Sequence, residues 1–244
     1  MHVHALTTSL LVFSICVHLA EALLSPTAAS ALVRDAMTAL TTQFTQVDLQ
    51  TMRSLDKILQ LFERERVDAE CFHGVNGYGY GDVGREKFDR IIASLMGTEA
   101  ALVRLQFFSG THAISTALFS AVRPGDEILG VSGAPYDTLE EVLGLRPNIQ
   151  TNSIAGSLKD YGVGYREIPL EDHPLRETEA RFDLRRIREV LEGPDRGKLR
   201  LLHVQRSCGY QWRPSIRLQE IERLAQYRRS AFPDPSERPV LFVD

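Results

Sequence analysis

The feature that most constrains the fold is an alternation of helical patterns with short apolar runs, which begins near residue 85 and continues to the last residue. The runs are rich in Val, Ile and Leu, and segments with apolar residues at helical spacing separate them. Alternation of this kind predicts an α/β fold with a mainly parallel sheet. The predicted strands are Ala100–Leu105, Glu127–Val131, Gly164–Ile168, Arg200–Val204 and Pro239–Val243.

The predicted helices are recognised by their apolar periodicity and by capping residues. Two of them precede the alternating part: one starts at Ser25 or Thr27 and runs through Leu40, and another covers Asp48–Arg66. The helices of the alternating part are Arg85–Met96, Thr111–Ala121, Asp137–Leu143, Asp183–Leu191 and Ser215–Arg229.

Composition and charge narrow the classes of function. The chain has 244 residues, with 28 Lys and Arg against 32 Asp and Glu, and a net charge of -4. A slightly acidic chain of ordinary globular composition argues against a dedicated nucleic-acid binder. Cys16, Cys71 and Cys208 are odd in number and far apart, so they indicate neither a disulfide framework nor a zinc site, and no metal is expected.

The amino-terminal segment differs from the rest. Ala5–Ala22 is apolar and nearly uncharged, yet its apolar part is too short to predict a membrane span. Ala20-Glu21-Ala22 has the form of a signal-peptidase site, although only His2 and His4 stand where Lys or Arg is usual. Residues 1–24 are therefore expected to be a targeting segment for an organelle, such as a plastid, or for the secretory pathway. A buried amino-terminal helix, a retained anchor and a cytoplasmic location remain alternatives.

A glycine-rich stretch, HGVNGYGYGDVGRE, contains a G-x-G-x-x-G formed by Gly79, Gly81 and Gly84. A dinucleotide site needs a strand before this motif and an acidic residue about 20 positions after it, at the end of the next strand. Here the preceding residues follow a helix and carry two acids, and the next predicted strand ends near Arg104. Nicotinamide or flavin binding, and with it an NAD(P)-dependent oxidoreductase, is therefore disfavoured.

A better phosphate site follows the first predicted strand, where Ser109, Gly110 and Thr111 open a helix. The N–H groups at a helix start carry partial positive charge and bind phosphate readily. The two hydroxyls add donors, and Gly110 lets the backbone approach a ligand closely. Helix capping by Ser109 explains the same residues without a ligand.

Two further residues follow predicted strands, at the edge where parallel sheets bind ligands. Tyr136 comes after the second strand, where its ring could stack on a planar ligand, although a half-buried loop tyrosine is equally typical. Asp244 follows the last strand, and a carboxylate in that position is suited to pair with a pyridinium nitrogen.

Together and in this order, the motifs resemble those of fold-type-I pyridoxal 5'-phosphate (PLP) enzymes, and more closely the methionine gamma-lyase-like family also called "aluminium resistance protein". The motifs are GYGYGDVGRE, EAALVRLQFFSGTHAISTALF, RPGDEILGVSGAPYDTLEEVLG, GSLKDYGVGYREIPL, QRSCGYQWRPS and LFVD. The resemblance covers Leu32–Asp244. It implies amino-terminal helices and a loop over residues 25–84, followed by a PLP-transferase-like large domain with a parallel-rich sheet over residues 85–244.

The resemblance also assigns roles to the residues just described. Ser109, Gly110 and Thr111 would hold the PLP phosphate, Tyr136 would stack on the pyridine ring, and Asp244 would pair with its nitrogen. The protonated ring would then act as an electron sink for a carbanion at the substrate Cα. Members of this family act on sulfur-containing amino acids and break a carbon–sulfur bond by elimination.

Further implications concern subunit contacts and the substrate. The glycine-rich loop would reach a neighbouring subunit of a homodimer or homotetramer, with Tyr78 or Tyr80 touching that subunit's PLP phosphate. Arg85 would contact an anion or be a surface charge. Cys208 stands where the family leads us to expect a basic residue, which leaves the contact to the substrate carboxylate unassigned.

One expected residue has no counterpart in the chain. Such enzymes bind PLP through a Schiff-base lysine that lies well after the ring-nitrogen aspartate. Lys57, Lys87 and Lys159 fall outside the expected position, and Lys198 precedes a strand at its wrong end, so no catalytic residue is assigned.

The resemblance further places two later strands between the first strand and the fourth, and a small C-terminal domain after them. We therefore expect the chain to be an amino-terminal fragment of a PLP-dependent carbon–sulfur lyase, truncated before those strands and inactive alone. A non-catalytic remnant of the fold that binds or dimerises is the alternative.

Overall fold

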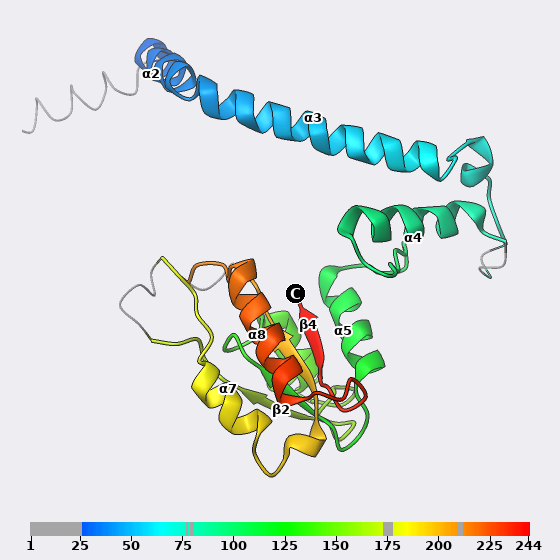
Figure 1. The fold of residues 1–244 in the computed structure, drawn as a ribbon, viewed down its shortest axis with the longest axis vertical. Helices are drawn as coiled ribbons and strands as arrows, with labels where there is room; N and C mark the ends of the chain where they lie inside the picture. Colours follow the sequence, from blue (N-terminus) through cyan, green and yellow to red (C-terminus); the bar gives the residue numbers. More distant parts are fainter. Residues whose placement is uncertain (1–25, 77, 79–80, 173–177, 209–211) are drawn as a thin grey trace, which may run out of the picture. The chain divides into compact units, whose positions relative to one another are not determined.

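The computed structural model describes residues 26–76, 78, 81–172, 178–208 and 212–244, which fall into two compact units (Figure 1). The first unit runs to Arg104, and the second covers Leu105–Asp244. The expected targeting segment, residues 1–24, and Tyr80 lie outside the described residues. None of the helices formed by the described residues is long and apolar enough to cross a membrane.

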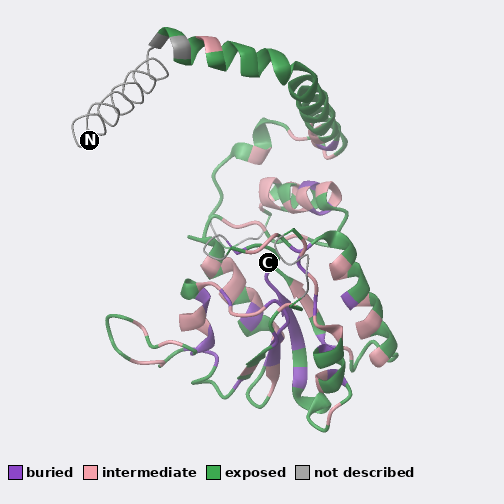
Figure 2. Ribbon diagram, turned by 90° about the vertical axis from the view of Figure 1, so that its left-hand side faces the viewer, coloured by how far each residue is buried: buried purple, intermediate pink, exposed green. Residues whose placement is uncertain are grey.

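The first unit consists of helices. They are α2 (Pro26–Ala39), α3 (Thr41–Arg64), the short 3-10 helix η1 (Ala69–Phe72) and α4 (Val83–Met96). The C-terminal half of α3 is fastened to α4, because Lys57 Nζ donates to the Leu95 carbonyl at 3.0 Å and Arg64 donates to Ser94 Oγ at 2.6 Å. The rest of α3 is exposed along its length (Figure 2).

The second unit is a parallel sheet with helices on both faces. Its strands are β1 (Glu127–Gly130), β2 (Gly164–Glu167), β3 (Leu199–Val204) and β4 (Val240–Val243), in the order β2-β1-β3-β4. Every neighbouring pair is parallel. The helices are α5 (Gly110–Ala121), α6 (Asp137–Leu143), α7 (Leu184–Leu191) and α8 (Leu218–Ala231), with the 3-10 helix η2 (Arg196–Lys198) before β3.

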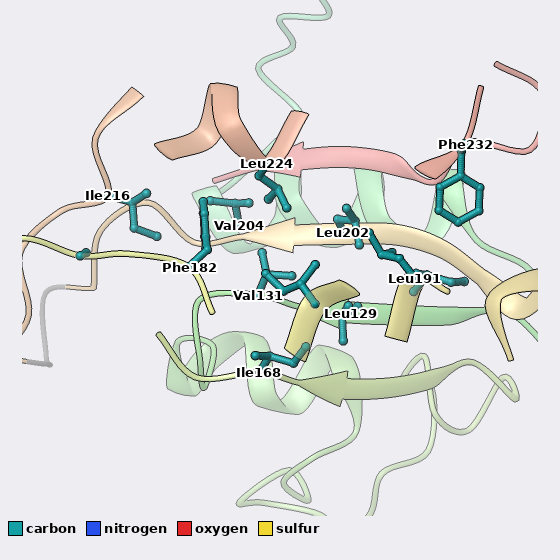
Figure 3. Packing of buried hydrophobic residues seen from close by; sticks show 13 residues of the cluster. Leu129, Val131, Ile168, Phe182, Leu191, Leu202, Val204, Ile216, Leu224 and Phe232 are labelled. Carbon is teal, nitrogen blue, oxygen red and sulfur yellow. The ribbon is translucent and has the colours of Figure 1, made fainter. Parts of the chain in front are cut away.

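Two buried clusters hold the sheet between its helices. On one face, Leu129 and Val131 of the β1 segment pack with Leu202 and Val204 against α7, α8 and Phe182 (Figure 3). On the other face, Ile128 and Leu201 pack against α5 and α6. Alternate residues of the central strands β1 and β3 are thus buried on opposite faces of the sheet, as expected for a parallel sheet. The predicted α/β class with a parallel sheet is confirmed.

Two expectations about the sheet are wrong. The segment predicted as the first strand, Ala100–Leu105, is irregular, with Leu105 99% exposed, and Asp89 rather than a neighbouring strand accepts the Val103 N–H at 2.9 Å. A strand is stabilised by pairing, and no described strand pairs with this segment. The resemblance also places two later strands between the first predicted strand and the fourth, which is β3. Both sides of β3 are already paired, one with β1 and the other with β4, so no further strand can lie next to it. The open edges of the described sheet are those of β2 and β4.

The strand order defines where a ligand is expected. From β1 the chain moves outward to β2, then crosses back to β3 and β4 on the other side of β1. In open parallel sheets, ligands bind beyond the carboxyl ends of the strands where the order reverses in this way. That position lies between the carboxyl ends of β1 and β3.

Candidate functional site

The amino-terminal end of α5 is formed as the sequence predicts. Ser109 is the N-cap residue, and its Oγ accepts the His112 N–H at 3.1 Å. No acceptor in the described residues receives the N–H groups of Gly110 and Thr111. A Cβ built on Gly110 would meet no atom within 4 Å, so no described atom packs against the backbone of Gly110 on that side. Capping and ligand binding are therefore compatible, since they use different groups.

A hydroxyl pair connects α5 with the next helix. Thr111 Oγ1 lies 3.1 Å from Thr138 Oγ1, in the first turn of α6. This contact brings the start of α5 to the start of α6, and Tyr136 is the N-cap residue of α6. The predicted phosphate-binding residues and the predicted stacking residue therefore lie at the same edge of the sheet.

Tyr136 is held at two points by the segment that follows β3. Its backbone N–H donates to Gln205 Oε1 at 2.9 Å, and its phenol donates to the Ser207 carbonyl at 2.7 Å. Gln205 Nε2 donates to the same Ser207 carbonyl at 3.3 Å. The aromatic ring is thus fixed by its main chain and by its far end.

Asp244 directly follows β4 at this edge. Its N–H donates to the Val204 carbonyl at 2.9 Å, and its own carbonyl accepts the Arg206 N–H at 2.8 Å. The side-chain Oδ2 is buried without a hydrogen-bond partner among the described residues. Burial raises the pKa of this carboxyl group above its ordinary value. A buried carboxylate oxygen without a partner is costly unless a donor or a cation reaches it.

The strand register aligns three polar side chains at the site. Gly130 pairs with His203, so two residues further along each strand Ser132 aligns with Gln205. Val204 pairs with Val243, so one residue further along Gln205 aligns with Asp244, and all three side chains lie on the same face. Ser132 Oγ accepts the Gln205 N–H at 2.9 Å, which ties the two strand ends together. Sequence reasoning missed Ser132 and Gln205, although both directly follow predicted strands, which is the position that drew attention to Asp244.

The segment around Cys208 does contain a fixed cation. Cys208 is buried, whereas Arg213 donates to the carbonyl of Gln205 at 2.8 Å and to that of Arg206 at 3.3 Å. Burial lowers the pKa of Arg213. The Arg213 guanidinium therefore satisfies the backbone carbonyls of Gln205 and Arg206, which follow β3 beside the site.

Residues 29–244 match the methionine gamma-lyase family. The chain belongs to this family. The match covers most of the chain and confirms the family that the ordered sequence motifs indicated. The parallel sheet of the second unit agrees with the predicted fold class.

Several known proteins resemble the chain. An uncharacterised Bacillus subtilis protein, YnbB, is 37% identical over 199 residues, which is 82% of this chain and 43% of YnbB. A Listeria monocytogenes structure, named as a candidate cystathionine beta-lyase involved in aluminum resistance, has a TM-score of 0.74 and 37% identity, covering 88% of this chain and 48% of that one. A carbon–sulfur lyase involved in aluminum resistance from Clostridium novyi has a TM-score of 0.72 and 34% identity, covering 88% and 47%. The chain thus spans less than half the length of these relatives.

The glycine-rich motif of this family member lies in the first unit. The residues before it form η1 instead of a strand, so the dinucleotide interpretation lacks the strand that it requires. Gly84 stands where a Cβ would overlap the Cys71 carbonyl oxygen, which gives this glycine a packing role. Tyr78 is 80% exposed, and Arg85 forms an ion pair with Asp82 at 3.1 Å. The ion pair with Asp82 favours the second of the two expected roles of Arg85, that of a surface charge on the helix.

None of the lysines of the second unit lies at the candidate site. Lys159 precedes β2, and Lys198 precedes β3 and pairs with Asp195 at 2.9 Å, so both lie toward the amino ends of the strands. In the first unit, Lys57 and Lys87 donate to the backbone carbonyls of Leu95 and Arg66.

Proposed function

We propose that this chain is the amino-terminal, cofactor-binding part of a PLP-dependent carbon–sulfur lyase acting on sulfur-containing amino acids. Family membership and the lyase names of the structural relatives support the reaction class. The lengths of the relatives support a larger fold-type-I enzyme, in which further strands, a small C-terminal domain and the lysine complete the site.

The observation that carries the proposal is that Asp244 Oδ2, at the carboxyl edge of the sheet, is buried and has no hydrogen-bond partner in the part of the chain that the structure describes. A pyridinium N–H is a cationic donor, and it would satisfy this oxygen and favour the ionised form of the carboxylate. The residues present therefore fit PLP, which when bound supplies an electron sink for the substrate Cα. Asp244 would keep the proton on the ring nitrogen.

The other end of the cofactor would be held by α5. Its phosphate would accept hydrogen bonds from the open N–H groups of Gly110 and Thr111, at the positive end of the helix dipole. The Ser109 hydroxyl would add a donor, because its Oγ accepts the His112 N–H and keeps its own proton to donate. The Thr111 hydroxyl would add another when Thr138 is the donor in the hydroxyl pair. Tyr136, fixed at two points, would stack on the ring between these ends.

Binding and turnover are separable in this proposal. None of the lysines of the second unit lies at the carboxyl edge, so we propose that the chain alone binds the cofactor reversibly and does not catalyse elimination. The alternative, a non-catalytic remnant that binds or dimerises, predicts the same behaviour for this chain. The two differ when the coding sequence is read beyond Asp244: a continuing frame with a lysine supports the lyase, and a genuine stop codon supports the remnant.

We also propose that the protein is a homo-oligomer in which the glycine-rich loop reaches a second copy. Tyr78 is 80% exposed, and α2 and α3 expose many apolar side chains. The family resemblance implies that Tyr78 or Tyr80 would touch the PLP phosphate of the neighbouring subunit.

Titration with pyridoxamine 5'-phosphate tests the cofactor proposal, because this analogue has no aldehyde and does not react with surface lysines. Wild-type chain should bind it, and Asp244→Asn should bind about 10- to 100-fold more weakly, as expected for the loss of a charged hydrogen bond. Glu237→Gln, on the surface of the same unit, is the matched control. Equal affinity of the wild type and Asp244→Asn would refute the assignment of Asp244.

Borohydride reduction after incubation with PLP tests the lysine assignment. We expect no covalent adduct that pyridoxamine phosphate prevents, since no lysine of the second unit lies at the carboxyl edge. A protectable adduct at one lysine, found by peptide mass spectrometry, would show that a lysine of this chain does reach the site.

A further inference from the structure

The geometry points to Gln205 as the positioning residue for the cofactor-stacking ring. We propose that its side chain fixes Tyr136 in the orientation in which the ring can stack, an inference that rests on the proposed function of this edge. Gln205 would act through Tyr136 and need not touch the cofactor itself.

The first argument is the way Gln205 is held. It is 1% exposed, and its main chain is tied on both sides: its N–H donates to Ser132 Oγ at 2.9 Å, and its carbonyl accepts from Arg213 at 2.8 Å. Buried side-chain amides must place each donor and acceptor on a partner. In Gln205 both groups serve the same purpose, because Oε1 accepts the Tyr136 N–H and Nε2 donates to the Ser207 carbonyl that also receives the phenol.

The second argument is what Tyr136 lacks without Gln205. Tyr136 is the N-cap residue of α6, and its carbonyl accepts the N–H groups of Leu139 and Glu140, but its side chain makes no capping bond. The helix therefore holds the Tyr136 carbonyl and leaves the N–H and the ring to Gln205 and Ser207. If Oε1 were removed, the Tyr136 N–H would have no partner among the described residues, and only the phenol would still connect Tyr136 to the segment after β3. A ring that moves freely must lose conformational entropy when a ligand binds, whereas a fixed ring has already done so.

The pair is also specific for glutamine. Asparagine is one methylene shorter at this site, and glutamate would set a second oxygen against the Ser207 carbonyl, where Nε2 now donates. Only a side chain with one acceptor and one donor at this reach satisfies Tyr136 and Ser207 together.

Hydrogen exchange tests, without any cofactor, whether the Gln205 side chain holds Tyr136 in place. Labelling with 15N-tyrosine gives one amide signal from each of the seven tyrosines, and the signal lost in Tyr136→Phe is that of Tyr136. In Gln205→Leu we expect this amide to exchange about tenfold faster, the effect of one hydrogen bond, while the other tyrosine amides keep their rates. Gln226→Leu, on the exposed face of α8, is the control. An unchanged rate at Tyr136 overturns the proposal.

A double-mutant cycle in pyridoxamine-phosphate affinity then tests the positioning role. We expect Gln205→Leu and Tyr136→Leu each to weaken binding about tenfold, and the double variant to bind no more weakly than Tyr136→Leu alone. Additive losses would show that Gln205 acts independently of the ring and would overturn the proposal, as would wild-type affinity in Gln205→Leu. If the wild type does not bind the analogue at all, the cofactor proposal fails, and the exchange experiment alone decides whether Gln205 holds Tyr136 in place.

Discussion

At the scale of single residues, a buried imidazole lies beneath the candidate site. His203 is 2% exposed, on the same face of β3 as Gln205, and its ring packs near Phe242 with centroids 5.7 Å apart. Its Nε2 has no hydrogen-bond partner among the described residues. Burial lowers the pKa of His203 from 6.5 to about 4, so the side chain is neutral at physiological pH.

This imidazole predicts a defined sensitivity to acid. The folded protein holds the pKa of His203 below its unfolded value. The contribution of the neutral, buried imidazole to the unfolding free energy is therefore fully present above pH 6.5 and is lost as the pH falls toward 4. We expect the wild type to lose about 2–3 kcal/mol more unfolding free energy than His203→Phe between pH 7.5 and 4.5. Urea unfolding at the two pH values measures it, with His73→Phe as the control for loss of one imidazole. Equal losses in the wild type and His203→Phe would contradict the prediction.

Gly84 illustrates how a glycine of a motif can serve packing. Replacement by alanine in a helix usually stabilises by up to about 1 kcal/mol, but here the Cβ would overlap the Cys71 carbonyl. Relief of such an overlap costs about 1–3 kcal/mol, so we expect Gly84→Ala to destabilise the first unit by about 1–2 kcal/mol. Thermal unfolding followed by circular dichroism measures this change. Gly74→Ala, with no atom within 4 Å of the new Cβ, should have little effect, and equal behaviour of the two variants would count against the packing role.

At the scale of elements, the start of α5 combines a cap with a proposed phosphate site. Ser109→Ala removes the acceptor of the His112 N–H and should destabilise the second unit by about 1 kcal/mol, whereas aspartate or asparagine keeps the cap. Ser109→Asp should therefore keep the unfolding free energy but weaken pyridoxamine-phosphate binding, since its charge repels the phosphate. Ser109→Asn should preserve the cap without that repulsion. Calorimetry and urea unfolding on the three variants separate the effects, and equal ligand affinity of the aspartate and asparagine variants would exclude a phosphate at this helix end.

Local sequence patterns predicted the elements whose stability is local. The strands β1 to β4 and the helices of the second unit lie within a few residues of their predicted bounds, because breakers and caps such as Ser109 mark them. The segment Ala100–Leu105 has the same apolar pattern, yet a strand also requires a partner, which the pattern does not contain. Gln205 was missed for a related reason, since its role depends on Tyr136, 69 residues earlier in the chain.

At the scale of the whole molecule, α3 carries apolar side chains on two sides. Leu61 is buried, and the residues around it face α4, while Met52, Leu55 and Leu59 are each more than half exposed at helical spacing. A contiguous exposed apolar stripe of this kind is usual at an interface between proteins. Together with the proposed loop exchange between subunits, it favours a second copy of the chain as the partner.

This surface predicts the oligomeric state. The wild type should have a mass by light scattering of at least twice that of one chain, which is 27.4 kDa. Leu55→Lys combined with Leu59→Lys should reduce it to that of one chain, because two charges on the stripe would each have to be buried without a partner. Gln46→Lys with Gln50→Lys adds the same charge to α3 without removing an apolar side chain, and should keep the wild-type mass. A monomeric wild type would contradict the homo-oligomer, and dissociation of both double variants would show that charge alone, and not the stripe, controls assembly.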